Sequence, residues 1–166
     1  MRFCESGMTF GDFSESDCFR IEKSEVYIRL SGKGIKTTDF LLHKPEDNKL
    51  LFVEAKETLP AKKNREAFNA EIAHISHQFM DSLQLSCGIW FGEHNKTADV
   101  PKNSVNFFRY GVQIVFVLVV KERTGSLLYI ADKIKQQLPK EHKLWRFDVI
   151  VLNKESAQKA KLVVKK

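Results

Sequence analysis

The chain has 166 residues, of which 43% are hydrophobic and 29% are charged, a composition typical of one folded domain and unlike that of a disordered chain. The formal net charge of +6 is a modest surplus that favours a polyanionic partner such as nucleic acid. The three cysteines, Cys4, Cys18 and Cys87, are widely spaced without a CxxC pair, which argues against a disulfide framework and against a zinc site.

Apolar runs are short throughout the chain. The first ten residues contain no run of signal-peptide length, and the longest run, residues 114–120, is far too short to span a bilayer. We therefore expect a cytoplasmic protein without membrane contact, organised as a single domain over residues 1–166.

The first part of the chain gives weak signals. Residues 1–16 are rich in glycine, serine and aspartate, and we expect them to be irregular. Residues 17–30 are ambiguous, because Ser14 or Ser16 could cap a helix whereas the alternation of apolar side chains also suits short strands. Of these two interpretations we favour the helix.

Stronger signals follow in the next part of the chain. Two strands are predicted at residues 36–43 and 49–56, because a cluster of turn-forming residues at 45–48 separates two apolar segments. A long helix is predicted at about residues 63–84, where apolar side chains recur at spacings of three and four.

The remaining elements alternate between strand and helix. Residues 87–92 and 112–120 are predicted strands, the second of them fully buried. A helix is predicted at residues 126–138, then a strand at 147–153 and a basic tail at 154–166. Strands that alternate with helices favour an α/β fold with a mixed sheet.

The predicted hairpin brings three charged side chains together at one end. Centring its turn between residues 46 and 47 places Asp39 opposite Glu54 and Thr37 opposite Lys56. Directly opposed side chains have Cβ atoms roughly 4.5–5.5 Å apart. Because side chains alternate between the two faces of a strand, Glu54 and Lys56 share a face, and Asp39 joins them there.

Away from this charged end, both faces of the hairpin are apolar. We therefore expect both to be covered, as in the interior of a layered α/β sheet. The charged face continues with Leu41, Leu50 and Phe52, and the other face carries Phe40, Leu42, Leu51, Val53 and Ala55.

Two facing carboxylates in apolar surroundings need a partner. They repel each other, and burying them unpaired is costly. A divalent cation between Asp39 and Glu54 would remove the conflict, and hard oxygen ligands suit Mg²⁺. Such an ion could polarise a phosphoryl oxygen and activate water, with Lys56 stabilising negative charge or orienting that water. The alternative is an ordinary ion pair at the end of a surface strand.

The order of these elements resembles the PD-(D/E)xK nuclease superfamily, which has the restriction-endonuclease-like fold. The resemblance rests on Asp39 in the segment TTDF, on Glu54 and Lys56 in the segment FVEAK, and on the long helix that follows, and it covers residues 36–85. Thr38 stands in place of the proline of the nominal pattern. The resemblance implies a three-layer α/β/α architecture with a central mixed sheet.

The resemblance also implies an activity, that of an Mg²⁺- or Mn²⁺-dependent phosphodiesterase acting on DNA or RNA. Asp39 and Glu54 would bind the metal ion, with the backbone carbonyl of Ala55 as a further ligand. Lys56 would assist the attacking water.

Two further site residues are suggested by the same resemblance. Many members place a glutamate on an early helix, for which Glu22 is the first candidate and Glu15 the second, provided that residues 17–30 are helical. Some members carry a glutamine on the helix after the lysine, often followed four residues later by tyrosine. Gln78 matches this glutamine, whereas Ser82 stands in the place of the tyrosine.

Residues for nucleic-acid binding are expected near this site. Lys62, Lys63 and Arg65 follow it directly and could hold a phosphate backbone, although a charged helix start would look the same. Gln78 is a further candidate, on a polar stripe that either lines a cleft or faces solvent. We expect a nucleic-acid partner, DNA before RNA, and the small size is compatible with a homodimer or a subunit of a larger complex. The alternative function is a non-cutting nucleic-acid- or protein-binding module on the same fold.

Overall fold

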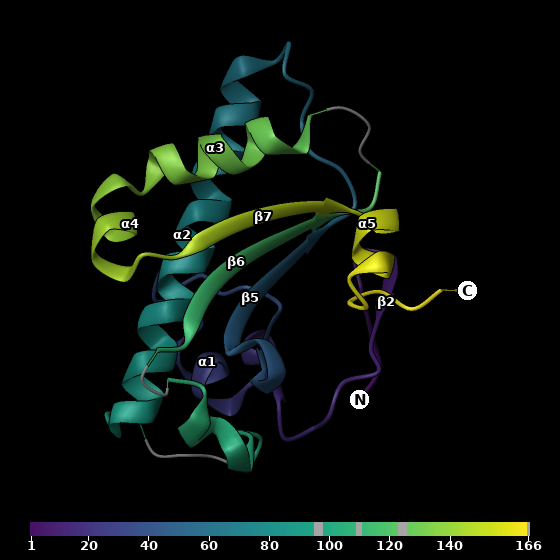
Figure 1. Ribbon diagram of the computed structural model, residues 1–166. Coiled ribbons are helices and arrows are strands. Elements are labelled where there is room, and N and C mark those ends of the chain that lie inside the picture. The colour runs from purple at the N-terminus through teal and green to yellow at the C-terminus, as the bar shows by residue number, and fades with distance from the viewer. Residues whose placement is uncertain (95–97, 109–110, 123–125, 166) are drawn as a thin grey trace.

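A computed structural model describes residues 1–94, 98–108, 111–122 and 126–165. Its centre is a five-stranded sheet with the spatial order β3 (Cys18–Phe19), β4 (Phe40–Lys44), β5 (Lys49–Lys56), β6 (Gln113–Val120) and β7 (Asp148–Asn153) (Figure 1). The pairs β3–β4 and β4–β5 are antiparallel, whereas β5–β6 and β6–β7 are parallel. The predicted α/β fold with a mixed sheet is thereby confirmed.

The hairpin formed by β4 and β5 has the predicted register. Pairing runs from Phe40 opposite Val53 to Lys44 opposite Lys49, and a 3-10 helix, η2 (Pro45–Asp47), makes the turn. The two faces of the hairpin enter two separate apolar cores, which confirms that both are covered. One core contains Leu41, Leu50 and Phe52, and the other contains Phe40, Leu42, Leu51, Val53 and Ala55.

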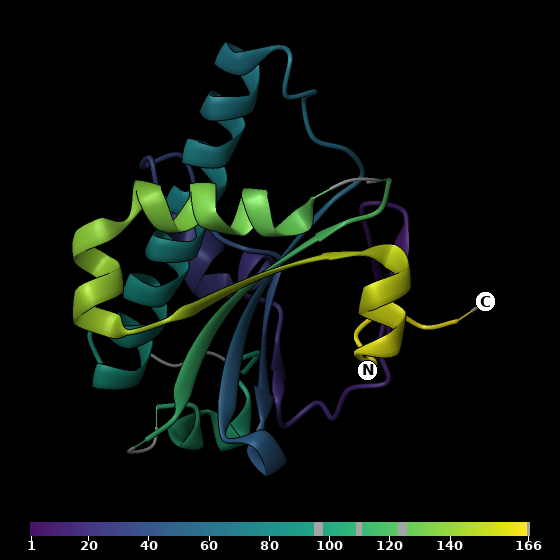
Figure 2. The ribbon, with the colours of Figure 1, turned by 45° about the horizontal axis from the view of Figure 1, so that its top comes forward.

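Helices cover one face of the sheet, and two of them, α2 (Arg65–Phe91) and α3 (Leu127–Gln137), cross each other in Figure 2. Phe79 stacks on Phe116 of β6 with ring centroids 4.6 Å apart, which ties the middle of α2 to the sheet. The helices on this side are α1 (Glu25–Leu30), α2 (Arg65–Phe91), α3 (Leu127–Gln137) and α4 (Pro139–Trp145), and η3 (Lys102–Asn106) is a 3-10 helix.

The strand predicted at residues 87–92 is wrong, because these residues form the last turns of α2 and its cap. Leu85 and Ile89 stay buried at the four-residue spacing of a helix, so the apolar face of α2 continues to its end. Gly92 then stops the helix in the left-handed conformation, with φ of 86°.

The opposite face of the sheet is covered by a β-hairpin and a short helix, β1 (Phe3–Glu5), β2 (Met8–Phe10) and α5 (Lys154–Lys159). Phe3 and Phe10 both pack edge-on against Phe40 of β4. The expectation of an irregular segment at residues 1–16 is therefore wrong for residues 3–10, which form this hairpin. The turn at Ser6 and Gly7 has positive φ at both positions, as a tight two-residue hairpin turn requires.

The C-terminal segment at residues 154–166 is also more ordered than a basic tail. After α5, Leu162 and Val163 are buried, and Val163 forms a β-bridge with Phe10. Apolar side chains thus anchor the segment beneath the N-terminal hairpin, while Lys159 and Lys161 are exposed. Lys166 lies outside the described residues.

Residues 17–30 combine both interpretations of their sequence. They form the short strand β3, a 3-10 helix, η1 (Ile21–Lys23), and then α1. Ser24, rather than Ser14 or Ser16, caps the helix by accepting a hydrogen bond from the Tyr27 amide. Within the described part of the chain, no helix is both long enough and apolar enough to cross a membrane.

Candidate metal centre at the end of β5

The chain leading into β4 is held by α2 instead of pairing with β5. For this reason the strand begins at Phe40, four residues later than predicted, and Thr37 is not a ladder partner of Lys56. Thr37 and Thr38 are buried. Three side chains of α2 bond this segment: Asp81 accepts from the Lys36 amide at 2.9 Å, Gln78 donates to the Thr37 carbonyl at 3.0 Å, and Ser82 accepts from the Thr38 amide at 2.7 Å.

Asp39 lies at the junction of this segment with β4. Its Oδ2 accepts a hydrogen bond from the Ala55 amide at 2.7 Å, which continues the ladder after the backbone pairing of β4 and β5 has ended. Burial raises the pKa of Asp39, and the neighbouring charge of Glu54 raises it further, whereas the bond from Ala55 lowers it. Glu54 is thus close enough to Asp39 for its charge to act on that carboxyl.

Glu54 is almost completely buried, with 3% of its surface exposed. Its Oε1 accepts a hydrogen bond from Gln78 at 3.0 Å and pairs with the ammonium of Lys56 at 3.1 Å. Its Oε2 is buried and finds no hydrogen-bond partner among the described residues. Burial raises the pKa of this carboxyl even though Lys56 and Gln78 act to lower it. A buried carboxylate oxygen without a partner is costly, and it is an available ligand atom.

Lys56 projects between two carboxylates. It pairs with Glu54 and also, at 3.3 Å, with Glu71 of α2. Burial acts to lower the pKa of Lys56, but the two carboxylates outweigh it, so the pKa lies above its usual value. The side chain consequently carries a positive charge at neutral pH, which suits it to stabilising negative charge.

A second group of acids meets Asp39 from the N-terminal part of the chain. Oxygen atoms of Glu5, Glu22 and Asp39 all lie within 4.8 Å of one another, close enough to share a metal ion. Glu22 comes from η1 rather than from a regular α-helix, and Glu15 is not in this group within the described residues. Glu5, at the end of β1, was not expected, and the Ser-Gly turn that follows it is the sequence signal that could have revealed it.

Two basic side chains accompany these acids. Arg20 pairs with Glu5 and, at 3.4 Å, with Glu22, while its guanidinium lies 4.5 Å from the ring centroid of Phe3. Lys23 pairs with Glu22 at 3.1 Å. These contacts offset part of the repulsion within the acidic group.

The backbone carbonyl of Ala55 is a further candidate ligand. It accepts a hydrogen bond from the hydroxyl of Ser6 at 2.8 Å, so the turn of the N-terminal hairpin lies against the end of β5. A carbonyl oxygen has two lone pairs, and the second can still meet a metal ion.

The candidate residues for nucleic-acid binding divide into two groups. Lys62, Lys63 and Arg65 are exposed around the start of α2, and the ammonium of Lys62 lies 3.7 Å from the ring centroid of Tyr129. Gln78 is buried, and its amide group is used to hold Glu54 and the segment before β4. The structure therefore gives Gln78 a positioning role within the site.

Comparisons with other proteins identify no relative. No protein-family model matches the chain, and neither a curated protein nor a solved structure matches it. The acids and the lysine gathered at the end of β5 are consequently the features from which a function must be inferred.

Proposed function

We propose that the protein is a metal-dependent nuclease of the PD-(D/E)xK type that hydrolyses phosphodiester bonds of DNA or RNA. The proposal depends on one observation, the buried carboxylate of Glu54 with the half-buried Asp39 and Lys56 beside it. The order of elements supports it, since an acid precedes β4, acid-x-Lys ends β5, and α2 follows, as in the restriction-endonuclease-like fold.

The residues present fit a divalent cation. Among the described residues, Glu54 offers a buried oxygen without a hydrogen-bond partner, and burial raises the pKa of both Glu54 and Asp39. Asp39 also belongs to the group with Glu5 and Glu22. Carboxylate oxygens together with the Ala55 carbonyl are the hard ligands that Mg²⁺ or Mn²⁺ takes.

The chemistry divides between the ion and the protein. A bound Mg²⁺ or Mn²⁺ would polarise the phosphoryl oxygen and acidify a coordinated water. Lys56 remains protonated, so we assign it to stabilising the charge that develops on the phosphoryl group and to orienting the attacking water. Gln78 fixes the position of Glu54.

The path of the nucleic acid is suggested by charge. Lys62, Lys63 and Arg65 are exposed just beyond β5 along the chain, where they can pair with phosphates on one side of the cleaved bond. Binding through such contacts weakens as salt concentration rises, because each neutralised phosphate releases counterions.

Cleavage tests the proposal directly. Labelled single- and double-stranded DNA and RNA are incubated with the protein and Mg²⁺, Mn²⁺ or a chelator. We expect cleavage only with metal, and a loss of about a hundredfold or more in Lys56→Ala. Lys49→Ala, at the other end of β5, is the matched control and should retain activity.

Two results would count against a nuclease. Absence of cleavage on every substrate with either ion would overturn the proposal. Binding without cleavage, unchanged in Lys56→Ala, would instead support the non-cutting binding module.

A further inference from the structure

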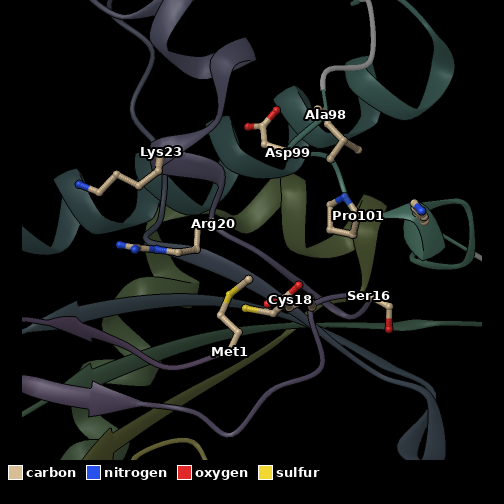
Figure 3. Close-up of a pocket in the computed structure, with 11 residues that line it drawn as sticks. Met1, Ser16, Cys18, Arg20, Lys23, Ala98, Asp99 and Pro101 are labelled. Carbon is tan, nitrogen blue, oxygen red and sulfur yellow. The ribbon is translucent and has the colours of Figure 1, made fainter.

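A cavity of about 550 Å³ lies beside the acidic group, within the size range of sites for small molecules. It is bounded by the segment leading into β3, by η1, and by the stretch just before η3. In Figure 3, Arg20 and Lys23 line one side, Ala98 and Pro101 line the other, and Met1 and Cys18 lie between them.

The walls of this cavity combine two kinds of chemistry. Met1, Cys18 and Pro101 give it an apolar surface, and the Cys18 thiol stays neutral because burial raises its pKa to about 12. Polar groups ring this surface, with carboxylates and a hydroxyl that accept hydrogen bonds and with basic groups that attract anions. These polar residues are Glu15, Ser16, Arg20, Lys23, Asp99 and Lys102.

An uncharged flat ring with amino groups at its edge, joined to a phosphate, matches this combination. The ring would pack on the apolar surface, its amino groups would donate to the carboxylates, and its phosphate would meet the basic side chains. A nucleotide has each of these parts, and a nucleobase can be read by hydrogen bonds to its edge once it is out of a stack.

The cavity is connected to the candidate metal centre by shared side chains. Arg20 and Lys23 line it and also pair with Glu22, and Arg20 pairs with Glu5 as well. In Figure 3 the guanidinium of Arg20 points away from Pro101, so the stem of the side chain forms the cavity wall while its charged end reaches the acids, which leaves Lys102 as the basic side chain that a phosphate in the cavity would meet. The side chains of Arg20 and Lys23 would therefore separate a nucleotide in the cavity from the acidic group.

We propose that this cavity binds one unpaired nucleotide of a single-stranded nucleic acid, next to the phosphodiester that is cleaved at Asp39 and Glu54. The inference rests on the proposed nuclease function and narrows its substrate. In an intact duplex the base is paired and stacked and cannot enter a cavity without being extruded, which costs energy. Single strands and frayed ends present such a base freely, so they are the preferred substrates.

Binding measurements on protein carrying Lys56→Ala, which should leave a bound strand uncut, test this inference. A short labelled single strand and a blunt duplex of the same sequence are titrated in Mg²⁺ and followed by fluorescence anisotropy. We expect the single strand to bind about tenfold or more tightly than the duplex, a difference that contact with one base can supply.

Two further variants locate the contact. Ala98 is exposed at the cavity wall, so Ala98→Trp should fill the cavity without disturbing the core and should remove the preference for the single strand. Ala160→Trp, at an exposed site after α5, is the matched control and should keep it. Lys102→Glu should weaken single-strand binding most strongly at low salt.

The outcomes separate the two proposals. Equal affinity for both substrates, or a preference that survives Ala98→Trp in a protein that still unfolds at its normal temperature, would overturn the cavity assignment and leave the nuclease proposal standing. If the unsubstituted protein neither binds nor cuts any nucleic acid, the nuclease proposal fails and the cavity assignment fails with it.

Discussion

Replacing Asp39 by asparagine should stabilise the ion-free protein at alkaline pH and at the same time abolish cleavage. The asparagine side-chain oxygen can still accept the hydrogen bond from the Ala55 amide, so the local geometry is retained. What disappears is a half-buried negative charge near Glu54, Glu22 and Glu5. The site is thus expected to reduce stability in return for function.

The magnitude follows from the pKa of Asp39, which rises from 3.8 in the absence of such surroundings to about 8 in the folded protein. A carboxyl with a raised pKa contributes stability that is complete below the unfolded pKa and is lost as pH rises through the folded pKa. Between about pH 6 and pH 8 the folded state holds close to one proton more than the unfolded state. The free energy of unfolding therefore falls by about 2 kcal/mol over this range, which lowers Tm by about 4–8 °C for a chain of this size.

Thermal unfolding in a chelating buffer, followed by circular dichroism across this pH range, measures the effect. The unsubstituted protein should lose stability towards pH 8, Asp39→Asn should lose less, and the difference between them should narrow as pH falls towards 3.8, the unfolded pKa of Asp39. Adding Mg²⁺ at pH 8, at a concentration one hundred times Kd, should raise the free energy of unfolding of the unsubstituted protein by about 2.7 kcal/mol. The same addition should leave the stability of Asp39→Asn unchanged.

Asp12 provides a control, because its pKa is shifted in the direction opposite to that of Asp39. It is exposed, and the hydrogen bond from Arg2 lowers its pKa. Asp12→Asn should therefore bring no gain at pH 8. A flat stability profile for the unsubstituted protein over this range would contradict a raised pKa for Asp39, as would an Asp39→Asn protein that is less stable at pH 8 without metal.

Three other substitutions test neighbouring parts of the site. Glu5→Gln should weaken Mn²⁺ binding by about tenfold in a calorimetric titration, because one charged ligand is lost, whereas Cys4→Ser on the exposed side of the same strand should not. Arg20→Gln should bind Mn²⁺ several-fold more tightly, since Arg20 occupies the same carboxylates as the ion, and unchanged affinity would show that the two do not compete. Gln78→Leu should reduce the free energy of unfolding by about 1–3 kcal/mol in urea, because it leaves buried acceptors unpaired, and a neutral result would contradict its positioning role.

The hairpin of β4 and β5 could be predicted because its information is local. The turn residues at 45–48 fix which positions face each other, and alternation along each strand assigns the faces. Asp39, Glu54 and Lys56 lie within this hairpin or directly before it, so their approach could be worked out from the sequence alone.

Glu5 could not be found in the same way, because its position depends on packing between distant segments. The hairpin β1–β2 reaches the end of β5 because Phe3 and Phe10 pack on Phe40, and three-residue strands are too short to show periodicity. The prediction of a strand at residues 87–92 is wrong for a different reason. A short apolar run suits a strand and a buried helix equally well, and only packing decides between them.

Hydrogen bonds from the middle of α2 hold Asp39 and Glu54 in place relative to each other. Gln78 bonds both Glu54 and the segment that carries Asp39, and Ser82 bonds that segment one turn further along α2. Substitutions that leave α2 in place should therefore keep the two carboxylates at their present separation. Among homologous sequences, Gln78 and Ser82 should accordingly vary less than the exposed residues of α2.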